Sequence, residues 1–379
     1  RATWKLKDLR QVATPPASDT RLLIGPTNYA GQGYAWARAA ETLEGVGARN
    51  LQQYDPGRWN RFPTDIGVRI NVWANSHIWK RRQLDALAGF THVLLEAARP
   101  IIVNDAWSEG GWNLGAHHIE QLQDLGLKVG LIWHGSDVRL PSMHAEMEPH
   151  SPYRGADDSW VTKVEQTVRQ NHQLADDMGL PEFVSNPYLQ SFRPNAAWLP
   201  TLSDPQRWDA PALVDDGHVP VVLHAPSRGI WKGTEHIRET LNRLEEEGLL
   251  KYIDVAEVPP DRMPDLVAAA DIVVDGILNG QYGVASLEAM LSRRVAVAHT
   301  WESVRTTVSR QAGITCPVVE ATPDSFEQVI RDLVKDPERR LALGEDGRRF
   351  VMSAHSQQAA ADKLRPFLES PTLQSAARP

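Results

Sequence analysis

The chain reads Val219-Pro220-Val221-Val222-Leu223-His224-Ala225-Pro226-Ser227-Arg228-Gly229-Ile230-Trp231-Lys232-Gly233-Thr234-Glu235. A short apolar run bounded by a proline-bearing loop predicts a strand buried in a parallel sheet, and a helix is expected from Gly233. The loop places Arg228 and Lys232 at the carboxyl end of that strand. Helix starts attract anions, and both side chains bind phosphate oxygens well. These two residues are therefore candidate diphosphate ligands, with an ordinary loop of solvated basic residues as the alternative.

The same alternation of strand and helix extends in both directions from this stretch. Before it, we predict strands over residues 20–25, 68–72, 92–95, 101–103, 129–133 and 196–199, and helices over 34–43, 78–88, 115–125 and 160–178. After it, we predict strands over 252–255, 271–274 and 295–299, and helices over 233–247, 263–270, 285–291, 325–335, 337–354 and 356–368. Strands that alternate with helices indicate parallel sheets covered on both faces.

A change in composition between residues 201 and 220 divides the chain. This region is rich in aspartate, proline and glycine, the residues of turns and linkers. The chain has 379 residues, and single cores stop growing at about 250–300. We therefore expect an α/β protein with two doubly wound, Rossmann-like domains, residues 1–203 and 204–355, that face each other across a cleft. Ligands of such folds bind at the carboxyl ends of the strands, so the cleft is the expected site.

A second glycine-bearing loop follows another predicted strand of the C-terminal half. The sequence runs Asp275-Gly276-Ile277-Leu278-Asn279-Gly280-Gln281-Tyr282-Gly283-Val284-Ala285-Ser286-Leu287-Glu288-Ala289-Met290. Gly283 permits a close approach of the backbone, so the amides of Val284 and Ala285 are candidates to face an anion. Glu288 lies one turn into the helix, where a carboxylate can accept hydrogen bonds from two ribose hydroxyls. A first-turn glutamate that only complements the helix dipole is the alternative.

The order of these parts resembles the donor-binding segment of family 4 glycosyltransferases, which have the two-domain GT-B fold. The resemblance covers most of residues 219–365. It rests on three segments, Arg228…Lys232-Gly233, Tyr282-Gly283…Glu288-Ala289-Met290 and Arg348-Arg349-Phe350-Val351…His355-Ser356.

The resemblance implies roles for these residues. Arg228 and Lys232 would hold the donor diphosphate, and Glu288 would hold the nucleotide ribose. The backbone of Gly283, Val284 and Ala285 would meet phosphate, and we include Tyr282 and Asp275 in the donor-binding set. In the resembling family the chain also crosses back at its end, so we expect the tail, residues 356–379, to pack on the N-terminal domain.

The chain departs from the family's pattern at two positions. Gly280 stands where the family has the first glutamate of a Glu-x7-Glu pair, which normally contacts the transferred sugar. Asp275 or backbone groups are the expected substitutes. Arg293 replaces a glycine that usually follows the Glu-Ala-Met segment, and this changes the expected turn.

Two features of the N-terminal half are candidate parts of the site. His134 follows a predicted strand in Trp133-His134-Gly135-Ser136-Asp137, where Asp137 is expected to cap the turn. By the family resemblance His134 would hydrogen-bond the donor sugar, whereas a lone histidine is more often structural. The loop Gly31-Gln32-Gly33 is expected to let a phosphate or an acceptor sugar approach. A dinucleotide-binding loop is the alternative, but it needs a third small residue where Trp36 stands.

The composition limits the partners. The net charge of −8 argues against a nucleic-acid ligand, and the single cysteine, Cys316, excludes an intrachain disulfide and a cysteine-rich zinc site. No apolar run approaches the ~18 residues of a spanning helix, and the first residues lack the apolar core of a signal peptide. We therefore expect a cytoplasmic protein with at most peripheral membrane contact, for which Lys80-Arg81-Arg82 is the candidate. No metal or other cofactor is expected.

These observations predict a retaining glycosyltransferase that moves a sugar from a nucleotide sugar donor to an acceptor hydroxyl on a small molecule, a glycan or a lipid-linked substrate. The catalytic candidates are His134, Arg228 and Lys232. Departure of a nucleoside diphosphate builds negative charge, which basic residues and a helix start can stabilise without a metal. Two alternatives stay open: a nucleotide-sugar epimerase or hydrolase, which would need an acid–base set, and a non-catalytic nucleotide- or sugar-binding protein, which Gly280 favours.

Overall fold

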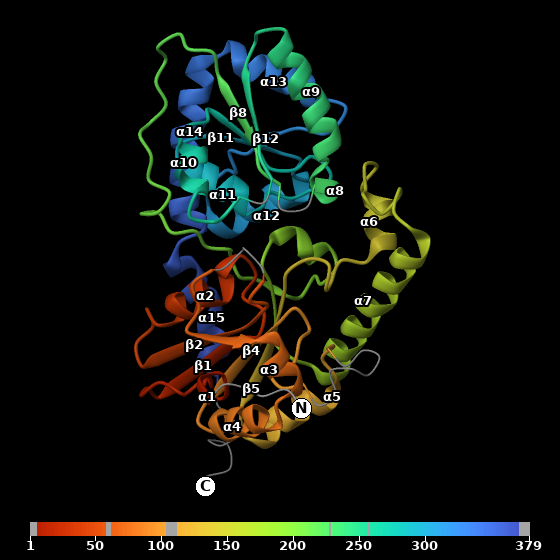
Figure 1. The fold of residues 1–379 in the computed structure, drawn as a ribbon, viewed down its shortest axis with the longest axis vertical. Coiled ribbons are helices and arrows are strands. Elements are labelled where there is room, and N and C mark those ends of the chain that lie inside the picture. Colours follow the sequence, from red (N-terminus) through yellow and green to blue (C-terminus); the bar gives the residue numbers. More distant parts are fainter. Residues whose placement is uncertain (1–5, 58–61, 104–111, 227–228, 257, 371–379) are drawn as a thin grey trace. The chain divides into compact units, whose positions relative to one another are not determined.

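The computed structural model describes residues 6–57, 62–103, 112–226, 229–256 and 258–370 (Figure 1). The chain divides into two compact units, each built on a parallel sheet. Unit 1 comprises Arg1–Leu140, Val164–Leu202 and Gln357–Pro379, and unit 2 comprises Pro141–Lys163 and Ser203–Ser356. The chain passes from one unit to the other four times, after residues 140, 163, 202 and 356.

Unit 1 contains a seven-stranded sheet with the strand order β3-β2-β1-β4-β5-β6-β7. The strands are β1 (Thr20–Gly25), β2 (Val46–Tyr54), β3 (Ile66–Arg69), β4 (His92–Glu96), β5 (Lys128–Trp133), β6 (Glu182–Val184) and β7 (Ala197–Trp198). All neighbours run parallel, so the strand ends that carry ligands in such sheets lie at one edge. β4 is buried along its whole length, which explains the apolar run Val93–Leu95 within it.

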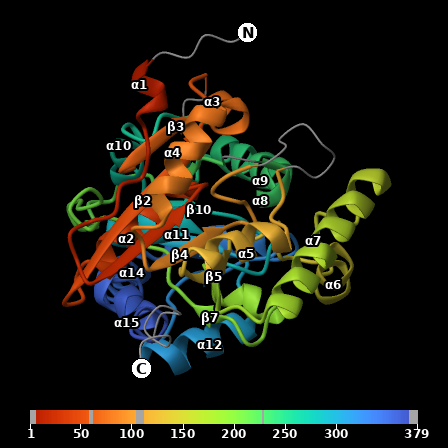
Figure 2. The ribbon, with the colours of Figure 1, turned by 90° about the horizontal axis from the view of Figure 1, so that it is seen from below.

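The helices of unit 1 cover this sheet. They are α1 (Leu6–Leu9), η1 (Tyr29–Gly31), α2 (Gln32–Ala40), α3 (Ile70–Asn75), α4 (His77–Leu87), α5 (Ala116–Asp124), η2 (Pro187–Ser191) and α15 (Gln357–Leu368); α7 (Asp158–Met178) begins in unit 2 and ends in unit 1. The C-terminal helix α15 packs beside α2 (Figure 1 and Figure 2). Phe367 of α15 contacts His92 and Phe183 edge-on, at ring distances of 5.1 and 6.0 Å.

Unit 2 contains a five-stranded parallel sheet with the order β12-β11-β10-β8-β9. The strands are β8 (Val221–His224), β9 (Lys251–Asp254), β10 (Ile272–Val274), β11 (Val295–Ala298) and β12 (Val319–Glu320). The helices are α6 (Pro141–Met147), α8 (Gly229–Lys232), α9 (Thr234–Glu246), α10 (Met263–Ala268), α11 (Val284–Leu291), α12 (Glu302–Ala312), α13 (Phe326–Lys335) and α14 (Pro337–Ala354). Figure 1 shows α9 and α13 on one side of this sheet and α10, α11 and α14 on the other.

Two of the predicted strands differ from the structure. Residues 101–103 form no strand: Ile101 and Val103 are buried in a loop, and the Ile101 carbonyl accepts a hydrogen bond from the Trp73 indole at 2.9 Å. In place of the expected strand 68–72, strand β3 ends at Arg69, because helix α3 begins at Ile70. Val68 and Val72 are buried, as are residues 101–103, and burial alone does not distinguish a strand from a loop or a short helix.

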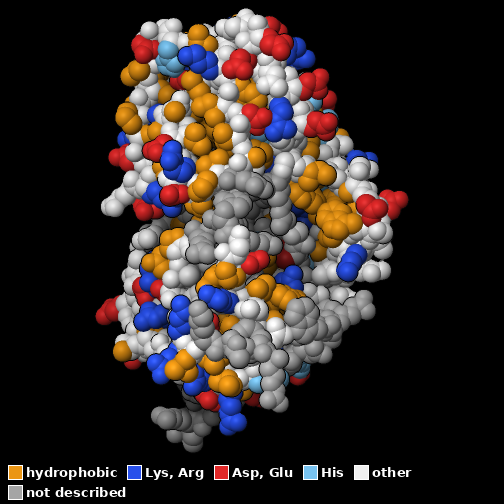
Figure 3. All heavy atoms as spheres, viewed as in Figure 1, with side chains coloured by type: hydrophobic (Ala, Val, Ile, Leu, Met, Phe, Trp, Pro, Cys, Tyr) orange, Lys and Arg blue, Asp and Glu red, His pale blue; other side chains and the backbone are white. Residues whose placement is uncertain are grey.

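The segment Pro141–Lys163 corrects the expected domain boundaries, because it belongs to unit 2 and not to the N-terminal domain. Glu148 of this segment accepts hydrogen bonds from His299 and Trp301 of unit 2, at 2.6 and 2.8 Å. Tyr153 packs edge-on against Trp231 with the ring centres 5.0 Å apart. Figure 3 shows hydrophobic side chains gathered over α6, and Met147 at its end is 41% exposed.

Candidate functional site

The site in unit 2 is built around an ion pair at the carboxyl ends of two neighbouring strands. Lys232 ends α8, after β8, and its ammonium group pairs with Asp275, the residue after β10. Asp275 is 3% exposed, and its carboxylate also accepts hydrogen bonds from the Gly283 amide at 2.7 Å and the Ser286 hydroxyl at 2.8 Å. Burial alone would raise the pKa of Asp275, but Lys232 and these hydrogen bonds lower it. Asp275 is therefore ionised and positions Lys232.

Two glycines make room for this ion pair. A Cβ atom on Gly283 would lie 2.9 Å from Asp275 Oδ2 and 3.4 Å from Lys232 Nζ. On Gly276 it would lie 2.8 Å from Lys232 Cδ. The glycines at these positions thus allow the lysine to fold back onto the loop, while a quarter of its side chain stays exposed.

The start of α11 adds unpaired backbone amides to the same loop. Gly283 is the N-cap in an extended conformation, and its own amide is used by Asp275. Within the described residues, the amides of Val284 and Ala285 in the first turn have no hydrogen-bond acceptor. Such amides, together with the helix dipole, favour a bound anion.

Glu288 lies one turn further along α11. Its side chain is half-buried and has no hydrogen-bond or ion-pair partner among the residues that the structure describes. Burial raises the pKa of Glu288 to about 8, with Arg207 opposing the shift and Asp275 adding to it. At neutral pH the carboxyl group is mostly protonated. A buried carboxyl without a partner costs stability and is typical of a binding or catalytic position.

Tyr282, one of the expected donor-side residues, belongs to the core of unit 2. It is 1% exposed and its hydroxyl pairs with His355 Nε2 at 3.1 Å, so the side chain anchors the loop to the end of α14 and is turned away from any ligand. The physical reason is packing, since the ring also contacts Phe350 edge-on at 6.0 Å. Arg228, the other expected diphosphate ligand beside Lys232, lies outside the described residues.

Gly280 cannot carry the side chain that the family resemblance places there. It adopts φ +68°, and a Cβ atom would lie 2.3 Å from the indole ring of Trp301. The indole nitrogen donates a hydrogen bond to Glu148 at 2.8 Å. Asp275 is no substitute for the missing glutamate, because Lys232, Gly283 and Ser286 occupy its carboxylate.

Arg293, the second departure from the family's pattern, preserves the turn. It adopts φ +57°, the left-handed conformation that glycine takes most easily. Its guanidinium group donates to Asp209 and to the Ala210 carbonyl, at 3.1 and 2.7 Å, and pairs with Glu345 at 3.2 Å. These contacts offset the conformational cost.

Glu148, His299 and Glu320 form a charge cluster that sequence reasoning missed, in which Glu148 is buried and Glu320 is exposed. Burial would lower the pKa of His299, but its hydrogen bonds to Glu148 and Glu320 raise it to about 9. Burial would raise the pKa of Glu148, but His299 and Trp301 lower it to about 2. Because Glu148 and His299 are 151 residues apart, no local pattern could have indicated the pair.

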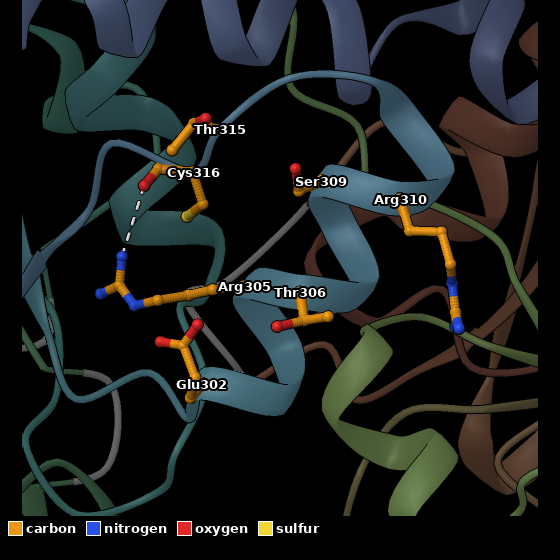
Figure 4. Close-up of a pocket in the computed structure, with 7 residues that line it drawn as sticks. All are labelled: Glu302, Arg305, Thr306, Ser309, Arg310, Thr315 and Cys316. Carbon is orange, nitrogen blue, oxygen red and sulfur yellow. Dashed lines mark hydrogen bonds between the residues drawn. The ribbon is translucent and has the colours of Figure 1, made fainter.

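A surface hollow of about 590 Å³ lies along α12 (Figure 4). Arg305 crosses it and donates a hydrogen bond to the Cys316 carbonyl at 3.3 Å. Neither Lys232 nor Glu288 lines it. Burial raises the pKa of the Cys316 thiol to about 11, which makes it a weak nucleophile. The hollow is therefore separate from the phosphate-binding candidates.

The residues of the loop Gly31-Gln32-Gly33 in unit 1 have structural contacts of their own. The Gln32 side chain forms two hydrogen bonds with the backbone of Leu202, at 2.7 and 2.8 Å. These bonds hold the end of the segment Val164–Leu202 of unit 1 in place. A Cβ atom on Gly33 would lie 2.5 Å from Asn50 Nδ2, so this glycine is needed for packing. Gly31 adopts φ +75° and is the N-cap residue of α2.

The backbone amides near this loop are directed inward. Thr27 and Asn28 donate to Glu96, at 3.1 and 2.9 Å, and Tyr34 donates to the Asn28 side chain at 3.0 Å. These amides are therefore not free for a phosphate. Trp36 fills the position of the third dinucleotide-binding glycine: it is fully buried and donates to the Pro200 carbonyl at 2.9 Å.

His134 lies just past β5, in a tightly packed setting. Its backbone amide donates to Asp137, which caps the turn as expected. The ring stacks on Trp36 at 5.6 Å and meets Tyr29 edge-on at 5.3 Å. Its Nε2 atom lies 3.4 Å from Oε1 of Glu96, the last residue of β4. Sequence reasoning missed Glu96, although its place at a strand end is the signal that identified His134.

The part of the chain that the structure describes offers neither a spanning segment nor a metal centre. None of its helices combines the length and the apolar character that crossing a membrane requires. No group of three or more histidine, cysteine, aspartate and glutamate side chains among the described residues is placed to hold a metal ion.

Solved structures resemble nearly the whole chain. Sucrose-phosphate synthase from Thermosynechococcus elongatus is 14% identical over 91% of this chain and 97% of its own, with a TM-score of 0.57. Anabaena HepE in complex with UDP-glucose is 10% identical over 92% and 99%, with a TM-score of 0.54. WaaG, a glycosyltransferase involved in lipopolysaccharide biosynthesis, is 11% identical over 92% and 100%, with a TM-score of 0.53.

The sequence itself matches no protein-family model and no curated protein. At such low identities the structural similarity shows the fold. The chain has the α/β GT-B fold, with two doubly wound, Rossmann-like domains.

Proposed function

We propose that the protein is a glycosyltransferase that moves a sugar from a nucleoside diphosphate sugar to a hydroxyl group of an acceptor. The observation that carries the proposal is the arrangement at the carboxyl ends of β8 and β10. It brings together the Lys232 ammonium group, the free amides of Val284 and Ala285 and the half-buried carboxyl of Glu288. A cation, a helix start and a ribose-binding carboxyl are the groups that a nucleoside diphosphate requires.

The proposed chemistry is electrostatic. Breaking the bond between sugar and phosphate builds negative charge on the leaving diphosphate. Lys232 and the α11 amides would stabilise that charge, and each charge-assisted hydrogen bond contributes roughly 1.5–3 kcal/mol. Stabilisation that grows in the transition state accelerates the reaction. Arg228, four residues before Lys232 in the sequence, is proposed to add a second cation.

The finer features of the reaction belong to the same proposal. We propose membership of glycosyltransferase family 4, retention of the anomeric configuration and a reaction that needs no metal. Retention would follow from attack on the face that the diphosphate leaves, with the departing phosphate assisting. The anomeric configuration of the product, read by NMR, tests retention, and an unchanged rate in EDTA tests the independence from metal. A small molecule, a glycan or a lipid-linked compound would serve as acceptor.

The first experiment measures binding and turnover with Lys232→Ala. UDP and UDP-glucose are the first ligands to test, because the structure of HepE holds UDP-glucose. Lys232→Ala should weaken UDP binding by roughly tenfold or more, the value of one charge-assisted hydrogen bond. Lys251→Ala, at an exposed lysine of β9, is the matched control. If the wild type and Lys232→Ala bind every member of a panel of nucleoside diphosphates with equal affinity, the assignment of Lys232 to a diphosphate site is wrong.

One observation favours a second candidate, a non-catalytic nucleotide- or sugar-binding protein. Trp301 occupies the space that a side chain at position 280 would need, so the sugar-side glutamate has no direct replacement. The two functions differ in turnover. Slow release of nucleotide from a nucleotide sugar supports the transferase, whereas tight binding without release, with any acceptor class, supports the binding protein.

A further inference from the structure

Glu96 is a fully buried carboxylate in unit 1 with one oxygen left unpaired. It ends β4, and β4 lies beside β5, whose end carries His134 (Figure 1). Oε2 accepts the amides of Thr27 and Asn28, at 3.1 and 2.9 Å. Oε1 has no hydrogen-bond partner among the described residues and lies 3.4 Å from His134 Nε2. A buried ionisable group with an unpaired oxygen lowers the stability of the fold, so packing alone does not account for Glu96 at this position.

The neighbouring residues hold the carboxylate and the imidazole in place. A Cβ atom on Gly33 would lie 3.1 Å from both Glu96 oxygens, so the glycine makes room for them. Trp36 stacks on the imidazole, and Tyr29 meets it edge-on. Nε2 of His134 is buried and, like Oε1 of Glu96, has no hydrogen-bond partner among the described residues, so each of these two atoms faces the other at 3.4 Å, whereas 12% of the His134 side chain is exposed. This leaves Nδ1 as the ring nitrogen that can face a ligand.

We propose that Glu96 and His134 form a carboxylate–imidazole dyad in which Glu96 fixes the Nε2–H tautomer and His134 accepts a hydrogen bond from a ligand hydroxyl through Nδ1. Glu96 is the positioning residue, and His134 touches the ligand. An unprotonated Nε2 would direct its lone pair at the carboxylate, which is repulsive. A neutral imidazole with Nε2–H can only accept at Nδ1.

The dyad decides which ligand group His134 can bind. The free oxygens of the diphosphate in a nucleotide sugar carry no proton at neutral pH, so they have nothing to donate to Nδ1. A sugar hydroxyl can donate. The identification of that hydroxyl as part of the sugar donor or acceptor rests on the proposed function, whereas the tautomer and the preference for a hydroxyl do not.

The tautomer can be read directly by long-range ¹H–¹⁵N NMR of the full chain. His134→Ala assigns the ring signals. The wild type should show Nε2–H. Glu96→Gln keeps an oxygen for the Thr27 and Asn28 amides but turns an NH₂ group toward Nε2, so the ring should switch to Nδ1–H. Glu41→Gln, at a half-buried glutamate of unit 1, should leave the ring unchanged. An Nδ1–H ring in the wild type overturns the proposal without any need for the variant to fold.

The ligand preference is tested with two simple probes. Methyl glucoside should shift the Nδ1 signal of the wild type, and sulfate, a tetrahedral anion that carries no proton at neutral pH, should not. The opposite result, a response to sulfate alone, overturns the hydroxyl assignment. Neither probe requires turnover, so this experiment gives an answer even if every nucleotide sugar proves inert.

Turnover supplies the third measurement. Glu96→Gln should lower kcat by roughly tenfold to a hundredfold, the value of one charge-assisted hydrogen bond, while UDP affinity stays unchanged. In the His134→Ala background, Glu96→Gln should have little further effect, because Glu96 acts through the imidazole. Additive losses would contradict the dyad. If no turnover exists but the tautomer switches as described, the proposed function fails and the dyad stands.

Discussion

Glu288 keeps its carboxyl group half-buried, and no described residue offers it a hydrogen bond. Its pKa is raised by burial from 4.5 to about 8, so its ionisation opposes folding. Below pH 4.5 the folded and unfolded states are both protonated. Between pH 4.5 and 8 only the unfolded state releases the proton, and stability therefore falls as the pH rises through this window.

Glu288→Gln should relieve this cost. The variant should match the wild type near pH 4 and exceed it above pH 8, by an amount that reaches roughly 3–5 kcal/mol at 1.36 kcal/mol per pKa unit. Urea unfolding at pH 4, 6 and 9 measures the difference. Glu235→Gln, at an exposed glutamate in the first turn of α9, is the control and should show no such trend. A difference that does not vary with pH would contradict the buried carboxyl.

Among the individual residues of the site, those at strand ends were the ones that the sequence could predict. Lys232 and Glu288 became candidates because apolar runs mark the strands and glycine-bearing loops follow them. Glu96 was not found, because its partner is decided by the order of the strands in the sheet, which places β4 beside β5. The Tyr282 side chain lies in the core, which the sequence could not predict, because a residue next to a loop glycine can face either outward or the core.

The loop between β10 and α11 depends on Gly280. Gly280→Ala would force a side chain into a left-handed conformation, at roughly 1–2 kcal/mol, and would also place a Cβ atom 2.3 Å from Trp301. Gly248 supplies a matched control, since it has φ +75° and a Cβ atom there would meet nothing within 4 Å. Gly280→Ala should therefore destabilise unit 2 by at least about 1 kcal/mol more than Gly248→Ala in urea unfolding. If both variants lose the same stability, the Trp301 side chain moves aside at no measurable cost.

The segment Pro141–Lys163 is held on unit 2 by aromatic contacts with Trp231 and Trp301 and also by charge. Protonated His299 lies between Glu148 and Glu320, and Arg305 also pairs with Glu320 at 3.2 Å. With its pKa raised to about 9, His299 contributes stability fully below pH 6.5 and loses it as the pH rises through 9. Glu148, with its pKa lowered to about 2, contributes above pH 4.5 and loses its contribution as the pH falls through 2.

Glu148→Gln should therefore loosen this segment. Chymotrypsin should cut after Tyr153 and Trp160 several-fold faster in the variant at pH 6, and the wild type should become similarly sensitive above pH 9. Rates are compared with those of a reference peptide at each pH. Glu146→Gln changes an exposed glutamate of the same helix and should leave cleavage unaffected. A wild type whose cleavage does not change with pH would rule out the charge-dependent attachment.

Among the helices and strands, the alternating pattern of the two sheets could be predicted from the sequence, whereas the placement of the segment Pro141–Lys163 could not. Apolar periodicity indicated most of the strands, because each must be covered on both faces. It could not assign Pro141–Lys163, since that segment lies between two parts of unit 1 in the sequence and packs through Glu148, His299 and Trp301 with unit 2. Contacts between residues about 150 positions apart leave no local signal.

In the molecule as a whole, each unit has its own core. The core of unit 1 joins β1, β4 and α2 to the C-terminal helix α15, which supplies five buried residues, Ala360, Ala361, Leu364, Phe367 and Leu368. The core of unit 2 joins β8, β10 and β11 to α9 and α13. Lys232 and Glu288 both belong to unit 2, while His134 and Glu96 belong to unit 1.

Removal of α15 should therefore abolish sugar transfer without abolishing nucleotide binding. A chain that stops after Ser356 loses three large buried side chains, each contributing about 1.5–3 kcal/mol, and this is comparable with the 5–15 kcal/mol that holds a domain folded. Unit 1 should unfold at a lower temperature and transfer should be lost, while UDP still binds to unit 2 through Lys232 and Glu288. Calorimetry with and without UDP measures both transitions. A chain that stops after Ser370 keeps all of α15 and is the control. If the shorter chain loses UDP binding while the transition of unit 2 is unchanged, part of the nucleotide site must come from unit 1, and the assignment to Lys232, Glu288 and the α11 amides is incomplete.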